Sequence, residues 1–155
     1  MDKLYKLLIL IFLVILSISL MDIFALKSSL FGDYDNYTTG QFNQNWWFLF
    51  RNIALLLIFG ISFTYYLLYQ DKSETISIAV GSLILWFTGL ADLLYFWIQG
   101  KAVPLTLPHL NDHIIIGKIS TLFGFSSVSN LSLYISVFIG ILITFLTVKW
   151  LKNKI

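Results

Sequence analysis

Apolar residues fill four long runs of this chain, and polar residues are confined largely to the stretches between them. The runs cover residues 4–26, 46–69, 75–98 and 131–151. Each is near the ~20 residues that a helix needs to cross a hydrocarbon core of about 30 Å. Backbone amides in lipid must be bonded within a helix or a closed barrel, and the alternating segments of a barrel do not occur in this sequence. The pattern predicts an all-α membrane bundle of four transmembrane helices, forming a single domain over residues 1–155.

The first run has two interpretations. A basic start, "MDKLYK", precedes the apolar residues, and "DIFA" ends near a small residue at Ala25. This order is also typical of a secretory signal peptide. The apolar region is long for a signal peptide, so we expect a retained helix.

The connections between the runs differ in length. Only "QDKSE" separates the second and third runs, which makes those helices antiparallel neighbours, while the other two connections are much longer. In the last connection, residues 111–123 place apolar side chains near helical spacing, and Gly124 follows as a stop. We expect a short helix here that lies in the membrane interface or is re-entrant, because it cannot span.

The basic residues predict that both termini face the cytoplasm. Lys and Arg concentrate near the cytoplasmic ends of membrane helices. With the N-terminus inside, the inner segments carry Lys3, Lys6, Lys72, Lys149, Lys152 and Lys154, against Lys27, Arg51, Lys101 and Lys118 outside. The expected location is therefore an integral membrane protein, N-in and C-in.

The amino-acid composition limits the classes of binding partner that the chain can have. Charged residues make up 12% of the chain and hydrophobic residues 58%, whereas a soluble domain carries about 25% charged residues. A net charge of +2 excludes nucleic-acid binding. Without cysteine there is no disulfide or thiolate chemistry. Membrane lipid is the expected partner, with a homo-oligomer or partner membrane subunits as further options.

Two ionisable residues fall inside the predicted spans. Such a group costs at least ~2.5–3.5 kcal/mol in hydrocarbon, so it is a functional candidate by default. Arg51 and Asp92 lie at similar depths from the outer ends of adjacent helices, which predicts an ion pair. The pair either locks two helices together or lines an outward-open pocket, with Arg51 binding an anion and Asp92 acting as acid, base or metal ligand. In a third interpretation Arg51 reaches the lipid head groups and does not meet Asp92.

Other polar residues fall in the same outer layer. Asp22 lies near the outer end of the first span, and Asn52 follows Arg51. On the third span, Gly81, Thr88 and Gly89 share a stripe with Asp92, and these small residues predict a helix-packing face. We list Asp22, Asn52 and His109 as candidate ligand-binding residues.

The stretch "LPHLNDHIIIGK" places His109 and His113 four residues apart. A helix that starts at Pro108 would put both imidazoles on one face, where they could share a metal. An N-cap at Asn111 would instead leave His109 in the preceding loop. With Asp92 the two would form a His/His/carboxylate set suited to zinc or iron. Interfacial histidines and a helix cap are the competing interpretation, and we favour it. The candidate catalytic residues are Asp92, Arg51 and His113.

Three classes of function remain. The first, which we favour, is an outward-facing polar pocket in the outer third of the bundle that binds or acts on a lipid, an amphipathic ligand or a metal. The second is a non-catalytic subunit or assembly factor of a larger membrane complex. The third, a transport element, is disfavoured because no continuous polar path crosses the inner two thirds. The sequence identifies no reaction.

Overall fold

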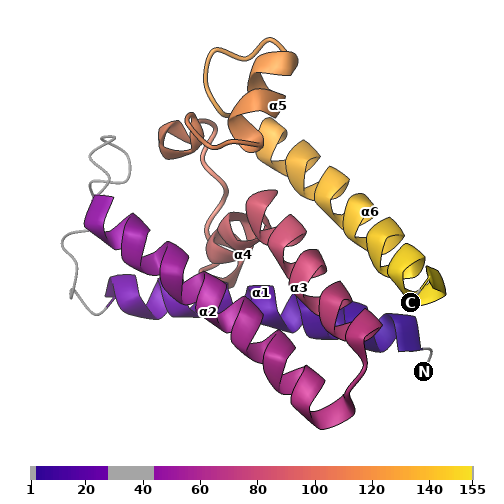
Figure 1. Ribbon diagram of the computed structural model, residues 1–155. Coiled ribbons are helices and arrows are strands. Elements are labelled where there is room, and N and C mark those ends of the chain that lie inside the picture. Colours follow the sequence, from indigo (N-terminus) through magenta and orange to yellow (C-terminus); the bar gives the residue numbers. More distant parts are fainter. Residues whose placement is uncertain (1–2, 28–43, 155) are drawn as a thin grey trace.

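The computed structural model of the chain describes residues 3–27 and 44–154, and most of these residues lie in helices, with no strand among them (Figure 1). The elements are α1 (Lys3–Lys27), α2 (Gln44–Tyr69), α3 (Lys72–Phe87), α4 (Leu90–Ile98), the 3-10 turn η2 (Pro108–Leu110), α5 (Ile116–Leu122) and α6 (Asn130–Lys154). The prediction of an all-α chain is confirmed.

Three helices are long and apolar enough to cross a membrane by length and composition. They are the segments Lys3–Phe24, Phe48–Tyr69 and Asn130–Asn153. A fourth candidate is the pair α3 and α4, which are bent against each other by 70°. The expected straight helix over residues 75–98 is therefore wrong: the apolar run is present, but it contains a sharp break.

The break is produced by Thr88 and Gly89. The Thr88 hydroxyl donates to the carbonyl of Ile84 at 2.9 Å, which ends α3. Gly89 then takes the left-handed conformation, with φ of 88°. A Cβ at Gly89 would lie 2.6 Å from Leu133 Cδ1 and 2.7 Å from Ile116 Cδ1. Glycine is needed here both for the backbone angle and for the close approach of α5 and α6.

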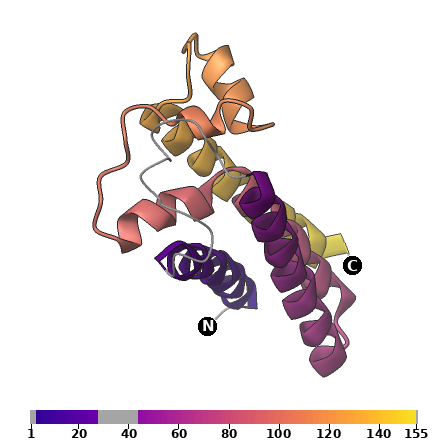
Figure 2. The ribbon, with the colours of Figure 1, turned by 90° about the vertical axis from the view of Figure 1, so that its left-hand side faces the viewer.

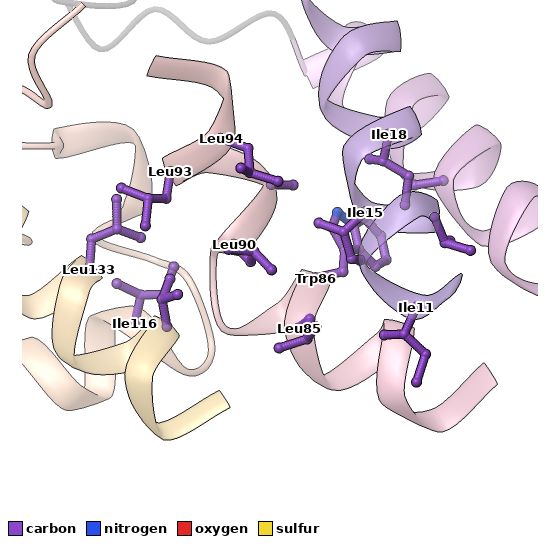
Figure 3. Packing of buried hydrophobic residues seen from close by; sticks show 14 of the residues in the cluster. Ile11, Ile15, Ile18, Leu85, Trp86, Leu90, Leu93, Leu94, Ile116 and Leu133 are labelled. Atoms are coloured by element: carbon purple, nitrogen blue, oxygen red, sulfur yellow. The ribbon is translucent and has the colours of Figure 1, made fainter. Parts of the chain in front are cut away.

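The core lies where α1, α3 and α6 meet, and α4 extends it toward α5. Figure 3 shows Leu93 beside Leu133 and Ile116, while Leu94 points toward α1. Side chains such as Ile11 and Ile15 are fully buried. Small residues allow the helices to approach, as is common in membrane bundles. A Cβ at Gly81 would lie 2.6 Å from Ile11 Cδ1, and one at Gly140 would lie 2.0 Å from Thr88 Oγ1.

Both termini lie at one end of the bundle, which we call the terminal end (Figure 1). There Lys3 Nζ lies 2.9 Å from Glu74 Oε1, joining α1 to α3. The Ser73 hydroxyl donates to the carbonyl of Leu151 at 3.0 Å, joining α3 to α6. The opposite end, which we call the loop end, carries α4, η2 and α5. Ends of α1, α2, α3 and α6 thus converge at the terminal end.

The segment between α4 and α6 is tied down by backbone hydrogen bonds. Leu107 N–H donates to Val128 O at 2.7 Å, and Thr106 forms an isolated antiparallel bridge with Ser129. The Asn111 side chain accepts from Val128 N–H at 2.8 Å, so it holds this loop and does not cap a helix. Helix α5 begins at Ile116, later than the expected start, and is followed by Gly124 with φ of 75°.

Candidate functional site

Two carboxyl groups lie on neighbouring turns of α1 and α4 at the loop end. The Ser19 hydroxyl donates to the carbonyl of Ala91 at 3.1 Å, which fixes α1 against α4. Asp22 lies one turn beyond Ser19, and Asp92 follows Ala91 directly. The two carboxyl groups are close enough to interact electrostatically. The buried Oδ1 of Asp22 has no hydrogen-bond partner among the residues that the structure describes.

Asp92 lies at the start of a broken helix. It is in the first turn of α4, where its carboxyl accepts from its own backbone N–H. Its Oδ2 lies 3.7 Å from the position that a Cβ would take on Gly89, so the carboxyl lies against the break itself. The N-terminus of a helix carries partial positive charge, which favours a carboxylate at this position. The break thus places an acidic group and irregular backbone together inside the bundle.

Arg51 does not take part in this site. Its side chain is exposed, and its guanidinium carbon lies 5.3 Å from the centroid of the Phe48 ring. Among residues 3–27 and 44–154, no ion pair joins it to Asp92. The expected Arg51–Asp92 pair is therefore wrong, because the 70° bend carries α4 away from α2 (Figure 2). Asn52 is half-buried on α2, and over the described residues no hydrogen bond joins it to the two carboxyls.

The histidines lie above the break but outside any common helix. His109 belongs to η2, and His113 precedes α5. The Nδ1 of His113 faces the backbone N–H groups of Ile115 and Ile116, each at 3.4 Å. These long contacts place an acceptor at the start of α5, which requires a neutral imidazole. The cap that the sequence predicted here was Asn111, so the contact of His113 with the start of α5 was not predicted.

Burial governs the charge of both imidazoles. Burial, with a smaller contribution from the charge of a protonated His113, lowers the pKa of His109 to about 4. Burial also lowers the pKa of His113. Neutral imidazoles are able to bind metal, but the rest of the predicted ligand set is missing. Within the described part of the chain, no group of three or more His, Cys, Asp or Glu side chains could hold a metal ion. The set His109, His113 and Asp92 is not assembled, because the two histidines do not share a helical face.

A second polar cluster, which the sequence did not predict, lies at the terminal end. Glu74 is only 8% exposed, and it pairs with Lys3 at 2.9 Å. The Tyr65 hydroxyl also donates to Glu74. Asp71 is the N-cap of α3, and its Oδ1 accepts from Glu74 N–H at 3.0 Å. The spacing of Asp71 and Glu74 follows the capping-box pattern and is visible in the sequence, whereas the pairing with Lys3 depends on the fold.

Comparisons with known proteins leave the geometry as the guide to function. The chain matches no family model, no curated protein and no solved structure. We therefore infer function from the residues and their contacts alone.

Proposed function

We propose that this chain is a multi-pass membrane protein that binds an amphipathic ligand at its loop end. The pair of carboxyls on Asp22 and Asp92 holds the polar head of the ligand. One observation carries the proposal: the two groups interact across α1 and α4, and no ion pair within the described part of the chain neutralises either of them. The bias of basic residues supports both termini in the cytoplasm and an extracytoplasmic loop end.

The chemistry of the pair selects the head group. Ionised carboxyls only accept hydrogen bonds. Two like charges in an apolar bundle are costly unless a proton, a cation or a hydrogen-bond donor lies between them. A head group that carries a primary ammonium or a hydroxyl supplies such a donor, and an ammonium also supplies the opposite charge. The ligand class is therefore a lipid or similar amphipath with an amine or hydroxyl head.

The loop end also offers apolar side chains to the bilayer. Ile114, Leu122 and Phe123 are 69%, 83% and 55% exposed around α5. Such side chains are expected at a membrane interface, where an amphipathic segment buries its apolar side among the head groups. This supports α5 as an interfacial helix that covers the site. In this scheme His113 caps α5 and does not touch the ligand.

Lipid retention tests the proposal. We would reconstitute the wild type, Asp22→Asn and Asp92→Asn in nanodiscs that contain equal amounts of phosphatidylethanolamine and phosphatidylcholine. Retained lipid is then counted by native mass spectrometry after extraction in mild detergent. Phosphatidylethanolamine has an N–H donor, whereas phosphatidylcholine has a quaternary ammonium without one. We expect the wild type to prefer phosphatidylethanolamine and both variants to lose that preference.

The matched control is Asp112→Asn, which changes an exposed carboxyl in the loop before α5. It is expected to bind like the wild type. Equal lipid retention by all four proteins would overturn the proposal.

A second candidate function is a non-catalytic subunit or assembly factor. It is favoured by α2, whose spanning segment has 17% of its residues buried, against 39% for α1 and for α6. Such a face suits either lipid or a partner helix. Size-exclusion chromatography with light scattering separates the candidates. A discrete, stable species supports ligand binding by the chain alone, and unfolding or aggregation without partners supports the subunit.

A further inference from the structure

Two adjoining hollows lie between α1 and α2 toward the terminal end. The first, which we call the head pocket, has a volume of about 390 Å³ and is lined by charged and phenolic side chains that include Lys3, Lys6, Tyr69, Asp71 and Glu74. The second, which we call the tail groove, has a volume of about 370 Å³ and is lined by apolar side chains that include Leu56, Leu57, Ile61 and Leu68. Leu10 and Tyr65 line both hollows. A polar hollow and an apolar hollow therefore lie side by side, with Leu10 and Tyr65 at their common border.

The acids of the head pocket are already satisfied within the protein. Glu74 pairs with Lys3 and accepts from the Tyr65 hydroxyl. Asp71 accepts from the first turn of α3. The helix N-terminus stabilises the charge of Asp71. Neither carboxylate needs an external cation.

Lys6 is the lysine of the head pocket whose ammonium has no carboxylate partner among the described residues. It lies one turn beyond Lys3 on α1 and is exposed. It forms no ion pair with any residue in 3–27 or 44–154. A lysine at the end of a membrane helix places its ammonium at the level of the lipid head groups. Lys3, Lys6, Asp71 and Glu74 together carry no net charge, and the Lys6 ammonium is the cation among them that is left to meet an anion at that level.

The tail groove has free space beside Gly60 of α2. A Cβ at Gly60 would meet no heavy atom within 4 Å. The glycines of the core differ, since added Cβ atoms there would collide with neighbouring helices. Glycine inside a helix costs about 0.5–1 kcal/mol relative to alanine, and at Gly60 no close helix contact within the described chain offsets that cost. The space at Gly60 is available to a ligand.

We propose that the head pocket and the tail groove together bind one molecule of an anionic phospholipid. Its phosphate lies at Lys6, and one acyl chain runs past Leu10 and Tyr65 along the tail groove. An apolar pocket with a few convergent polar groups is the usual form of such a site. The candidate spans of α1 and α2 end at Lys3 and Tyr69, so the head pocket is at the depth where lipid phosphates lie. The site is separate from the carboxyl pair at the loop end.

Four variants test the site in nanodiscs of phosphatidylglycerol and phosphatidylcholine in equal amounts, with retained lipid counted by native mass spectrometry. Lys6→Gln removes the cation and is expected to lower retained phosphatidylglycerol about fivefold, as expected for one lysine near an anionic lipid. Lys118→Gln changes an exposed lysine at the loop end and is expected to have no effect.

The groove is tested by a matched pair at one position. Gly60→Leu fills the tail groove and is expected to lower retention of both lipids. Gly60→Ala raises helix propensity in the same way but leaves the groove open, so it is expected to retain lipid like the wild type. Both side chains enter open space, so both variants are expected to fold.

Retention equal to wild type in both Lys6→Gln and Gly60→Leu would overturn the site and leave only unspecific lipid around the helices. Loss in Lys6→Gln alone would reject the groove, and loss in Gly60→Leu alone would reject the phosphate contact. Asp22→Asn is expected to keep its phosphatidylglycerol, so failure of this site is distinguishable from failure of the loop-end proposal.

Discussion

The two ends of the bundle hold buried acids in opposite circumstances. At the terminal end, Glu74 has a cation at 2.9 Å and a phenol that donates to it. At the loop end, Asp22 and Asp92 interact with each other, and one oxygen of Asp22 has no partner within the described chain. A buried carboxylate with its partners in place stabilises a fold, whereas a pair of like groups without partners destabilises it. The difference marks the terminal-end acid as structural and the loop-end pair as the candidate for function.

The helices are packed more tightly around the loop-end acids than near the terminal end. At the loop end, Gly89 and Gly140 allow helices to approach so closely that an added Cβ would overlap a neighbour. Near the terminal end, the position of Gly60 faces open space. The loop end therefore offers unsatisfied charge in a tight setting, and the terminal end offers space beside satisfied charge.

The largest effect on stability is expected from substitutions that disturb the close helix packing. Gly89→Ala is expected to lower the free energy of unfolding by about 2–5 kcal/mol, because left-handed backbone and close packing are both violated. Gly140→Ala, with its Cβ 2.0 Å from Thr88 Oγ1, is expected to cost about 1–3 kcal/mol. Gly60→Ala is the matched control and is expected to gain up to about 1 kcal/mol. Titration with SDS in mixed micelles measures all three. Equal losses at Gly60 and Gly140 would show that helix contact is not the cause.

An intermediate effect is expected when an acid at each end is replaced by its amide. Glu74→Gln keeps the shape of the side chain but removes the ion pair with Lys3, whose side chain is 66% exposed. We expect a loss of about 1 kcal/mol, since an exposed lysine partner is partly screened. Asp22→Asn replaces one of the two buried carboxyl groups by a neutral amide, and we expect no loss or a gain of about 1 kcal/mol. The same unfolding assay applies. A larger loss for Asp22→Asn than for Glu74→Gln would reverse our assignment of the two ends.

The last expected effect is a pH dependence at the loop end. The pKa of His109 falls from 6.5 to about 4 on burial, so between these values the unfolded chain binds the proton that the folded chain does not. Its contribution to stability is complete above about pH 6.5 and is lost as the pH falls toward 4. We expect His109→Gln to flatten the decline of the melting temperature between about pH 7 and pH 5, where histidine titrates. The less buried His113, as His113→Asn, serves for comparison and is expected to change it less. Identical slopes for wild type and His109→Gln would contradict the burial of His109.

The sequence predicted the apolar runs well because lipid imposes a strong and local requirement. A helix that spans must be apolar throughout, so its position can be read from consecutive residues. The break at Thr88 and Gly89 was not predicted, since both residues also fit a continuous helix with a packing face. What selects the bend is contact with Leu133 and Ile116, which lie far along the chain.

Part of the candidate site was also predicted from positions along the apolar runs. Depth along a helix can be counted, so Asp22 and Asp92 were assigned to one layer, and the structure brings them together. Arg51 was paired with Asp92 on the assumption of a straight third span, and the bend removes that pairing. The cluster at Glu74 was missed because its cation comes from Lys3, far away in sequence. The connection between the first two apolar runs, residues 28–43, lies outside the described residues.

The break between α3 and α4 also sets an order of events during biogenesis. The contacts at the break come from Ile116 in α5 and from Leu133 and Gly140 in α6, and both helices follow the break in the sequence. Residues 72–98 emerge from the ribosome as one apolar segment long before those contacts exist. We therefore expect the geometry that brings Asp92 near Asp22 to be completed only after α6 has packed against α3. A chain truncated before α6 would insert its earlier helices without assembling the carboxyl pair.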